Sequence, residues 1–132
     1  MTEHASDADR LATLDRLFDA FNRHDADAVM RCFTPGAVFL AAAGGEACGR
    51  RIAGPGAIRD AFAAVWAGMP DVQWTVRRSR VLGGEAITEW LFTGTRPDGS
   101  RVEAEGLDLF AFEGSSIASK SAFRKDRPPI VA

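Results

Sequence analysis

The sequence predicts an α+β fold in which helices pack on one face of an antiparallel sheet. Before Pro70, three segments carry apolar residues at helical spacing. After Pro70, four strand-like segments are separated by the turn sequences GGE, PDGS and EGSS, which are typical of hairpins. With 132 residues, 46% of them hydrophobic, the chain fits one domain over residues 1–132 with its core at about 7–126.

Each predicted helix has its own start and stop signals. The first begins after Ser6, which caps it together with Asp9, and ends at Arg23 and His24. Its apolar side is formed by Leu11, Leu14, Phe18 and Phe21. A short second helix starts at Asp25 or Asp27 and ends before Pro35; it carries Val29, Met30 and Phe33. The third opens at Pro55 and stops at Gly68 and Pro70.

The strands follow from apolar runs bounded by turns. A short strand is predicted over 37–42 and a loop containing four glycines over 43–54. Four strands then form a meander, and the last residues are extended. The meander strands are Val72–Leu82, Ala86–Thr95, Arg101–Phe112 and Ile117–Arg124.

Composition excludes several classes of function. A formal net charge of −2 argues against a nucleic-acid partner, and Arg77, Arg78 and Arg80 are interpreted as a solvated strand face. No apolar run approaches 18 residues and the acidic start has no apolar segment, so neither a membrane span nor a signal peptide is predicted. Two cysteines without metal-ligand spacing favour a cytoplasmic protein with reduced thiols. Two histidines are too few for a zinc site, and the glycines form no phosphate-loop or dinucleotide pattern, so neither a metal nor a cofactor is predicted. Fourteen arginines against two lysines, with abundant alanine, hint at a bacterial source.

One charged residue interrupts an otherwise apolar strand face. In the segment RVEAEGLDLFAFEG, Asp108 alternates with Val102, Ala104, Gly106, Phe110 and Phe112. An unpaired buried carboxylate is costly, so Asp108 requires a partner, a proton or a function. A structural ion pair with Lys120 or Arg124 and a functional acid or base are both open at this point.

The register across the hairpins decides which side chains lie beside Asp108. If Asp98 and Gly99 centre their hairpin, Glu89 faces Asp108 and Leu91 faces Gly106. A three-residue loop at 113–115 then places Lys120 opposite Asp108. The same register puts an apolar row on the outer face, formed by Leu107, Leu109, Ile117 and Phe123. A one-residue slip would exchange Glu89 for Thr88 or Trp90, and Lys120 for Ser119 or Ser121.

Several segments in order resemble one family. LDRLFDAFNRHDADAVMRCF, GPGAIRDAF, PDVQW, EWLFTGT and GLDLFAFEG are similar to the SnoaL-like branch of the nuclear-transport-factor-2-like superfamily, which also holds ketosteroid isomerase. The resemblance covers about residues 7–126. It implies a conical fold, with a curved sheet wrapped around three helices and a pocket, and a homodimer through the outer sheet face.

The resemblance also gives residue roles. It aligns Asp108 with the acid/base aspartate of SnoaL-like polyketide cyclases and with the oxyanion-hole aspartic acid of the isomerase. The isomerase's base falls at Ala41 and its tyrosine at Leu17, and the chain contains no tyrosine. The candidate catalytic residues are Asp108, Glu89 and Lys120. The candidate substrate-binding residues are Leu17, Phe21, Phe62, Trp66, Leu91 and Phe110.

Two functions of different classes follow. The first is a cofactor-free isomerase, cyclase or hydrolase that acts on an apolar small molecule, with Asp108 as acid/base. The second is a binding or assembly module without chemistry. An open cavity beside an unpaired Asp108 would favour the enzyme, and a filled interior with an ion-paired Asp108 would favour the module.

Overall fold

The computed structural model describes residues 5–131, and its element order confirms the α+β class. A six-stranded sheet runs in the order β2-β1-β6-β5-β4-β3, antiparallel throughout except where β1 lies parallel to β6. The elements are α1 (Asp7–Asn22), α2 (Ala26–Met30), β1 (Phe33–Leu40), β2 (Arg51–Ala53), α3 (Pro55–Gly68), β3 (Gln73–Leu82), β4 (Glu85–Thr95), β5 (Arg101–Glu113) and β6 (Ser116–Arg124).

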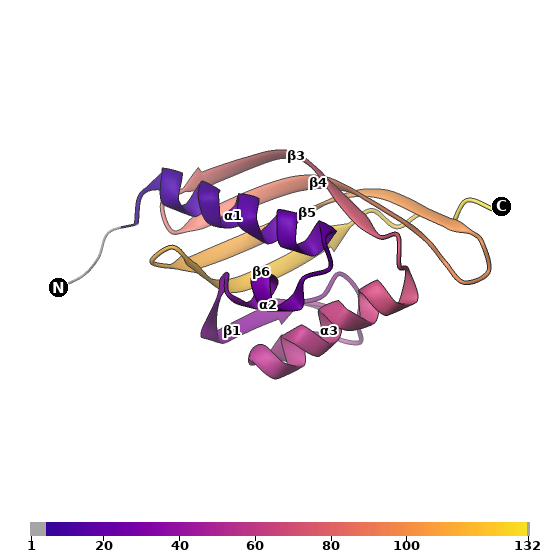
Figure 1. Ribbon diagram of the computed structural model, residues 1–132, viewed down its shortest axis with the longest axis horizontal. Coiled ribbons are helices and arrows are strands. Elements are labelled where there is room, and N and C mark those ends of the chain that lie inside the picture. The colour runs from indigo at the N-terminus through magenta and orange to yellow at the C-terminus, as the bar shows by residue number, and fades with distance from the viewer. Residues whose placement is uncertain (1–4, 132) are drawn as a thin grey trace.

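The helices cover one face of this sheet. Figure 1 shows α1 running across the sheet, with α2 and α3 lower in the view beside β1. α1 packs against β3, and α3 packs against β1 and β2. The predicted cap of α1 is confirmed: Ser6 accepts a hydrogen bond from the Asp9 backbone N–H, and Asp9 accepts one from that of Ser6. None of the helices within residues 5–131 is both long and apolar enough to cross a membrane.

The first strand and the segment that follows it differ from the prediction. Phe33 opens β1 rather than ending the second helix, and β1 covers Phe33–Leu40 instead of 37–42. Pro35 is tolerated because the pairing of β1 with β6 is interrupted between Phe33 and Val38. The predicted loop over 43–54 contains the three-residue strand β2, in which only Ile52 is buried. So short a strand has no alternation that sequence patterns can detect.

A bulge in β6 changes which side chains face the helices. Phe112 pairs with Ile117 but Ala111 pairs with Ser119, so Ala118 is an extra residue in β6. The extra residue reverses the alternation. Ile117 is therefore fully buried, and its predicted place on the outer face is wrong.

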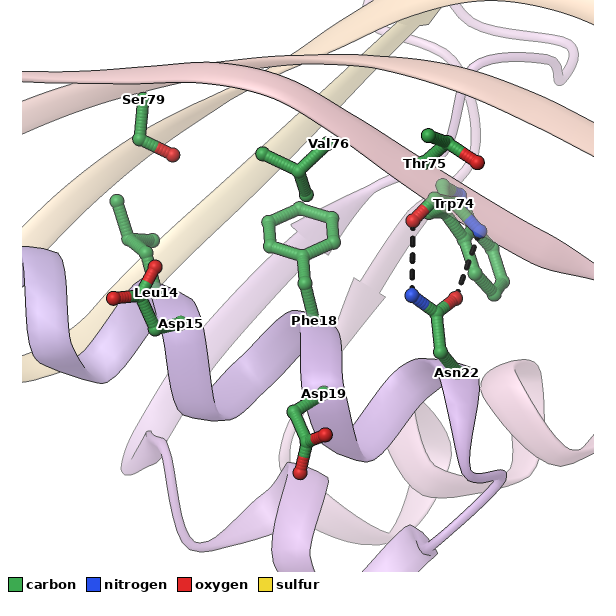
Figure 2. A pocket seen from close by; sticks show the side chains of 9 residues that line it. All are labelled: Leu14, Asp15, Phe18, Asp19, Asn22, Trp74, Thr75, Val76 and Ser79. Atoms are coloured by element: carbon green, nitrogen blue, oxygen red, sulfur yellow. Dashed lines mark hydrogen bonds between the residues drawn. The ribbon is translucent and has the colours of Figure 1, made fainter.

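The edge strand β3 is held by a side chain of α1. The Asn22 amide donates from Nδ2 to the Trp74 carbonyl at 2.9 Å, and its Oδ1 accepts from the Trp74 N–H at 2.8 Å. Figure 2 shows both hydrogen bonds, with Asn22 reaching from the end of α1 to β3. This pair fastens the helix to the start of the strand.

Candidate functional site

The register between β4 and β5 brings Thr88, and not Glu89, opposite Asp108. Arg96 N–H donates to the Ser100 carbonyl, and Gly99 adopts a φ of 86°, so the turn is centred on Asp98 alone. The prediction that Glu89 faces Asp108 is therefore wrong, and the slip to Thr88 is the arrangement found. Glu89 lies on the outer face, where the Arg78 guanidinium donates to it at 2.6 Å and lowers its pKa.

Asp108 is fully buried and has two polar partners. The Lys120 ammonium lies 3.1 Å from Oδ1, and the Trp90 indole N–H donates to Oδ2 at 3.1 Å. Lys120 sits diagonally from Asp108, because Ala122 is the residue directly opposite. The predicted register, with Lys120 directly opposite Asp108, is therefore wrong, because Glu113 pairs with Ser116 and only two residues form the turn. The predicted ion pair is nevertheless present, since the long Lys120 side chain spans the diagonal.

Burial dominates the electrostatics of this carboxyl group. Loss of solvent raises the pKa of Asp108 above its usual value, while the charge of Lys120 and the hydrogen bond from Trp90 oppose the rise. Oδ1 has the ammonium close by but accepts no hydrogen bond of good geometry. The attraction of Lys120 thus offsets only part of the cost of removing the Asp108 carboxylate from solvent.

The other side of the Lys120 ammonium is enclosed by aromatic rings. Nζ lies 4.5 Å from the centre of the Phe39 ring, 5.5 Å from that of Phe21 and 5.7 Å from that of Phe62. These ring faces attract the cation, which is nearly as buried as its partner.

Gly106 makes the Trp90 contact possible. A Cβ at this position would collide with the Trp90 ring and with the Phe123 backbone carbonyl. The missing side chain lets the indole lie against β5, from where its N–H reaches Asp108.

A pocket of about 620 Å³ opens above this pair, between α3, the sheet and the segment after β1. Lys120 and Trp90 line it, but Asp108 does not; it lies behind them. The aromatic part of the wall is formed by Phe21, Phe39, Phe62, Trp74, Trp90 and Phe92. The volume and the apolar wall are those of a small-molecule site.

A family model for the SnoaL-like domain matches residues 14–120. The chain belongs to the SnoaL-like family. No curated protein matches it.

Solved structures share the fold of this SnoaL-like protein. A protein from Jannaschia sp. CCS1 described as a SnoaL-like polyketide cyclase has a TM-score of 0.79 at 19% identity, covering 94% of this chain and 92% of that one. A ketosteroid isomerase-like protein from Catenulispora acidiphila, in complex with trimethylamine, has a TM-score of 0.76 at 16% identity, covering 84% and 83%. TerC, co-crystallized with polyporic acid, has a TM-score of 0.76 at 11% identity, covering 89% and 92%. At these identities the similarity establishes the fold alone.

The predicted substrate-binding residues of this SnoaL-like chain separate into three groups. Phe21 and Phe62 line the pocket. Leu17, Trp66 and Phe110 are buried core residues and are not part of the pocket wall. Leu91 pairs with Glu105 on the same face as Glu89, so its predicted place opposite Gly106 is wrong.

Sequence reasoning missed several wall residues. Trp90, Phe39 and Arg124 line the pocket but are not among the candidate site residues predicted from the sequence. A signal for Trp90 did exist, because β4 alternates Ala86, Thr88, Trp90, Phe92 and Gly94 against a row that contains Glu85 and Glu89. The apolar row is the buried one. Within residues 5–131, no three His, Cys, Asp or Glu side chains gather as metal ligands.

A second hollow of about 380 Å³ lies between α1 and β3. Figure 2 shows Phe18 pointing from α1 toward Val76, with the carboxylates of Asp15 and Asp19 at its border. It does not include the Lys120–Asp108 pair, so the larger pocket is the candidate site.

Proposed function

We propose that this SnoaL-like protein binds a small molecule with an aromatic or apolar body and catalyses a cofactor-free proton transfer on it, of the isomerase, cyclase or hydrolase type. The observation that carries the proposal is the buried Lys120–Asp108 pair at the base of an open pocket. A perturbed ion pair at a ligand cavity is typical material for acid–base chemistry.

The geometry favours a division of roles within the pair. The sequence assigned the acid/base role to Asp108, but only Lys120 reaches the wall of the pocket. The Lys120 ammonium would donate a hydrogen bond to a substrate oxygen that gains negative charge while a water molecule in the open pocket accepts the C–H proton. Asp108 would act as a positioning residue, holding the ammonium at 3.1 Å and balancing its charge.

The neighbouring structures support a small-molecule ligand in general terms. One was solved with trimethylamine and another with polyporic acid, so this fold holds ligands of different chemistry. For the present chain the ligand class rests on its own pocket wall.

A non-catalytic binding module is the second candidate. The two features that were expected to separate the candidates disagree. The open cavity favours the enzyme, whereas the ion-paired Asp108 favours the binding module. In addition, none of the Asp or Glu residues in the described part of the chain lines the pocket, so none of their carboxylates is in place as a base. This observation favours binding without chemistry.

Deuterium exchange separates the two candidates. The protein is incubated in D₂O with a panel of small neutral aryl ketones, and the exchange of their acidic C–H protons is followed by NMR. The enzyme predicts an acceleration that falls by roughly 10²-fold or more when the pair is replaced in the double variant Asp108→Asn/Lys120→Met. Equal exchange in both proteins, or tight binding of ketones without exchange, would favour the module.

We further propose a homodimer through the outer sheet face. Ile87, Leu109 and Phe123 are 38%, 40% and 53% exposed, and Leu107 pairs with Phe123 on the same face. Ile87, which pairs with Leu109, lies in the outer apolar row in which Ile117 was expected. Burial of each such side chain is worth about 1.5–3 kcal/mol. Light scattering at micromolar concentration should give a dimer, and Leu109→Lys should give a monomer; a monomeric wild type would refute the proposal.

The cytoplasmic location and the bacterial source of the protein remain predictions from the sequence.

A further inference from the structure

The wall of the pocket carries positive charge that nothing on the wall balances. Arg50, Arg96 and Arg124 line the pocket, and no acidic residue among 5–131 does. Within residues 5–131, none of these three arginines forms a salt bridge. Lys120 is neutralised by Asp108, so the excess comes from the three arginines. The chain as a whole has a formal net charge of −2, which makes this local excess stand out.

Two of the arginines are close enough to disfavour each other. The Arg124 guanidinium lies over the Phe92 ring, 4.6 Å from its centre, and is held there partly out of solvent. Burial lowers the pKa of Arg124, the nearby charge of Arg96 lowers it further, and Asp126 opposes both. A negative group placed between two such guanidinium groups relieves their repulsion and accepts hydrogen bonds from both.

The rest of the wall fits a planar body. Phe92 and Trp74 lie with ring centres 5.3 Å apart, and Phe92 also carries the Arg124 guanidinium on its ring. An apolar ring system resting on these side chains would therefore bring an attached acid group to the arginines. The wall of the pocket is therefore amphipathic, with an aromatic part and a cationic part.

We propose that the ligand of this pocket is an aromatic carboxylate, whose ring contacts the aromatic wall and whose acid group is bound by Arg96 and Arg124. The inference deepens the proposed function, rests on the same pocket, and replaces the apolar molecule expected from the sequence by an anion with an apolar body. Arginine presents a planar pair of donors that matches the two oxygens of a carboxylate.

A pair of ligands that differ only in charge tests this. 2-Naphthoate and 2-naphthamide are titrated by isothermal calorimetry into the wild type, Arg124→Gln, Arg96→Gln and Arg80→Gln. Arg80 is an exposed arginine of β3 outside the pocket wall, so its variant controls for loss of one positive charge. Thermal melts establish that each variant is folded.

The wild type should bind the acid about tenfold tighter than the amide, because charged hydrogen bonds are stronger than neutral ones. Arg124→Gln and Arg96→Gln should each remove most of that preference for the acid over the amide, and Arg80→Gln, outside the pocket wall, should leave both affinities unchanged. Equal binding of acid and amide in the wild type would overturn the inference, as would loss of acid binding in Arg80→Gln alone or no binding of the acid at millimolar concentration. The deuterium-exchange assay uses neutral ketones, so it tests the proposed proton transfer independently of the proposed binding of a carboxylate.

Discussion

Replacing Lys120 by methionine isolates the ion pair at the base of the pocket. Methionine keeps most of the length and volume of the side chain but removes the ammonium, which lies 3.1 Å from Asp108 Oδ1. Asp108, with no exposed surface, then keeps the Trp90 indole N–H as its one hydrogen-bond donor. The substitution therefore leaves a buried carboxylate without a counter-charge.

The size of the effect follows from that burial. Removing one partner of a buried ion pair typically costs roughly 3–5 kcal/mol of unfolding free energy. For a chain of this length such a loss lowers Tm by roughly 10–20 °C. Replacing both partners should cost far less, because the double variant Asp108→Asn/Lys120→Met strands no charge. Most of the loss should therefore be recovered in the double variant.

The deficit should depend on pH in a defined direction. Burial raises the pKa of Asp108 in the folded protein from 3.8, and loss of the Lys120 charge removes the main opposing influence. A carboxyl whose pKa is raised by folding contributes stability that is present below the unfolded pKa and is lost as pH rises through the folded pKa. The stability gap between the wild type and Lys120→Met should be wide at neutral pH and narrow in acid.

Urea unfolding between pH 4 and pH 8, followed by tryptophan fluorescence, measures this gap. Lys125→Met is the matched control, because Lys125 is the other lysine of the chain and is exposed. A Lys120→Met variant within about 1 kcal/mol of the wild type at neutral pH would refute the reasoning, since a broken buried pair costs more than that. A gap that does not change with pH would refute the assignment of the cost to Asp108.

Three further predictions concern the same region. Asp108→Asn removes the group whose raised pKa makes the wild type lose stability as pH rises. The unfolding free energy of this variant minus that of the wild type should therefore increase from acid to neutral pH. A decrease of this difference, measured by urea unfolding, would contradict the raised pKa of Asp108. Gly106→Ala should lower the unfolding free energy by about 1–3 kcal/mol, because the added methyl group collides with backbone and with the indole ring, and an unchanged urea midpoint would contradict this. The protein should be a poor ketosteroid isomerase, because Ala41 stands where the isomerase has its base and Leu17 stands where it has its tyrosine. Loss of one oxyanion donor alone lowers the rate by about 10²-fold or more. The assay follows the conjugation of a β,γ-unsaturated ketosteroid by absorbance, and rapid conjugation would show that this alignment is wrong.

The features that depend on one strand or one helix were predictable. Burial of Asp108 follows from alternation along β5, and the cap at Ser6 follows from the residues next to it. The burial of Asp108 and the cap at Ser6 needed no knowledge of distant parts of the chain. Lys120 also faces inward as predicted, because the register between β5 and β6 differs there from the predicted one by two residues, and a shift by two keeps the same face.

The features that depend on pairing between strands were not predictable in detail. The turn after β4 is centred on Asp98 rather than between Asp98 and Gly99, and this shift by one residue turned Glu89 and Leu91 to the outer face. The bulge at Ala118 turned Ile117 inward by the same logic. Both depend on hydrogen bonds that sequence patterns leave open, and they decide which side chains meet at the pocket.

The Asn22 side chain has a consequence for how the molecule behaves in a crowded solution. β3 is the last strand of the sheet, and an edge strand offers its free N–H and C=O groups to any other chain that can pair with them. At Trp74 both groups are already occupied by one amide, which copies the donor and acceptor of a neighbouring strand. A single asparagine thus closes the start of this edge to a foreign strand and protects the fold from β-type aggregation there.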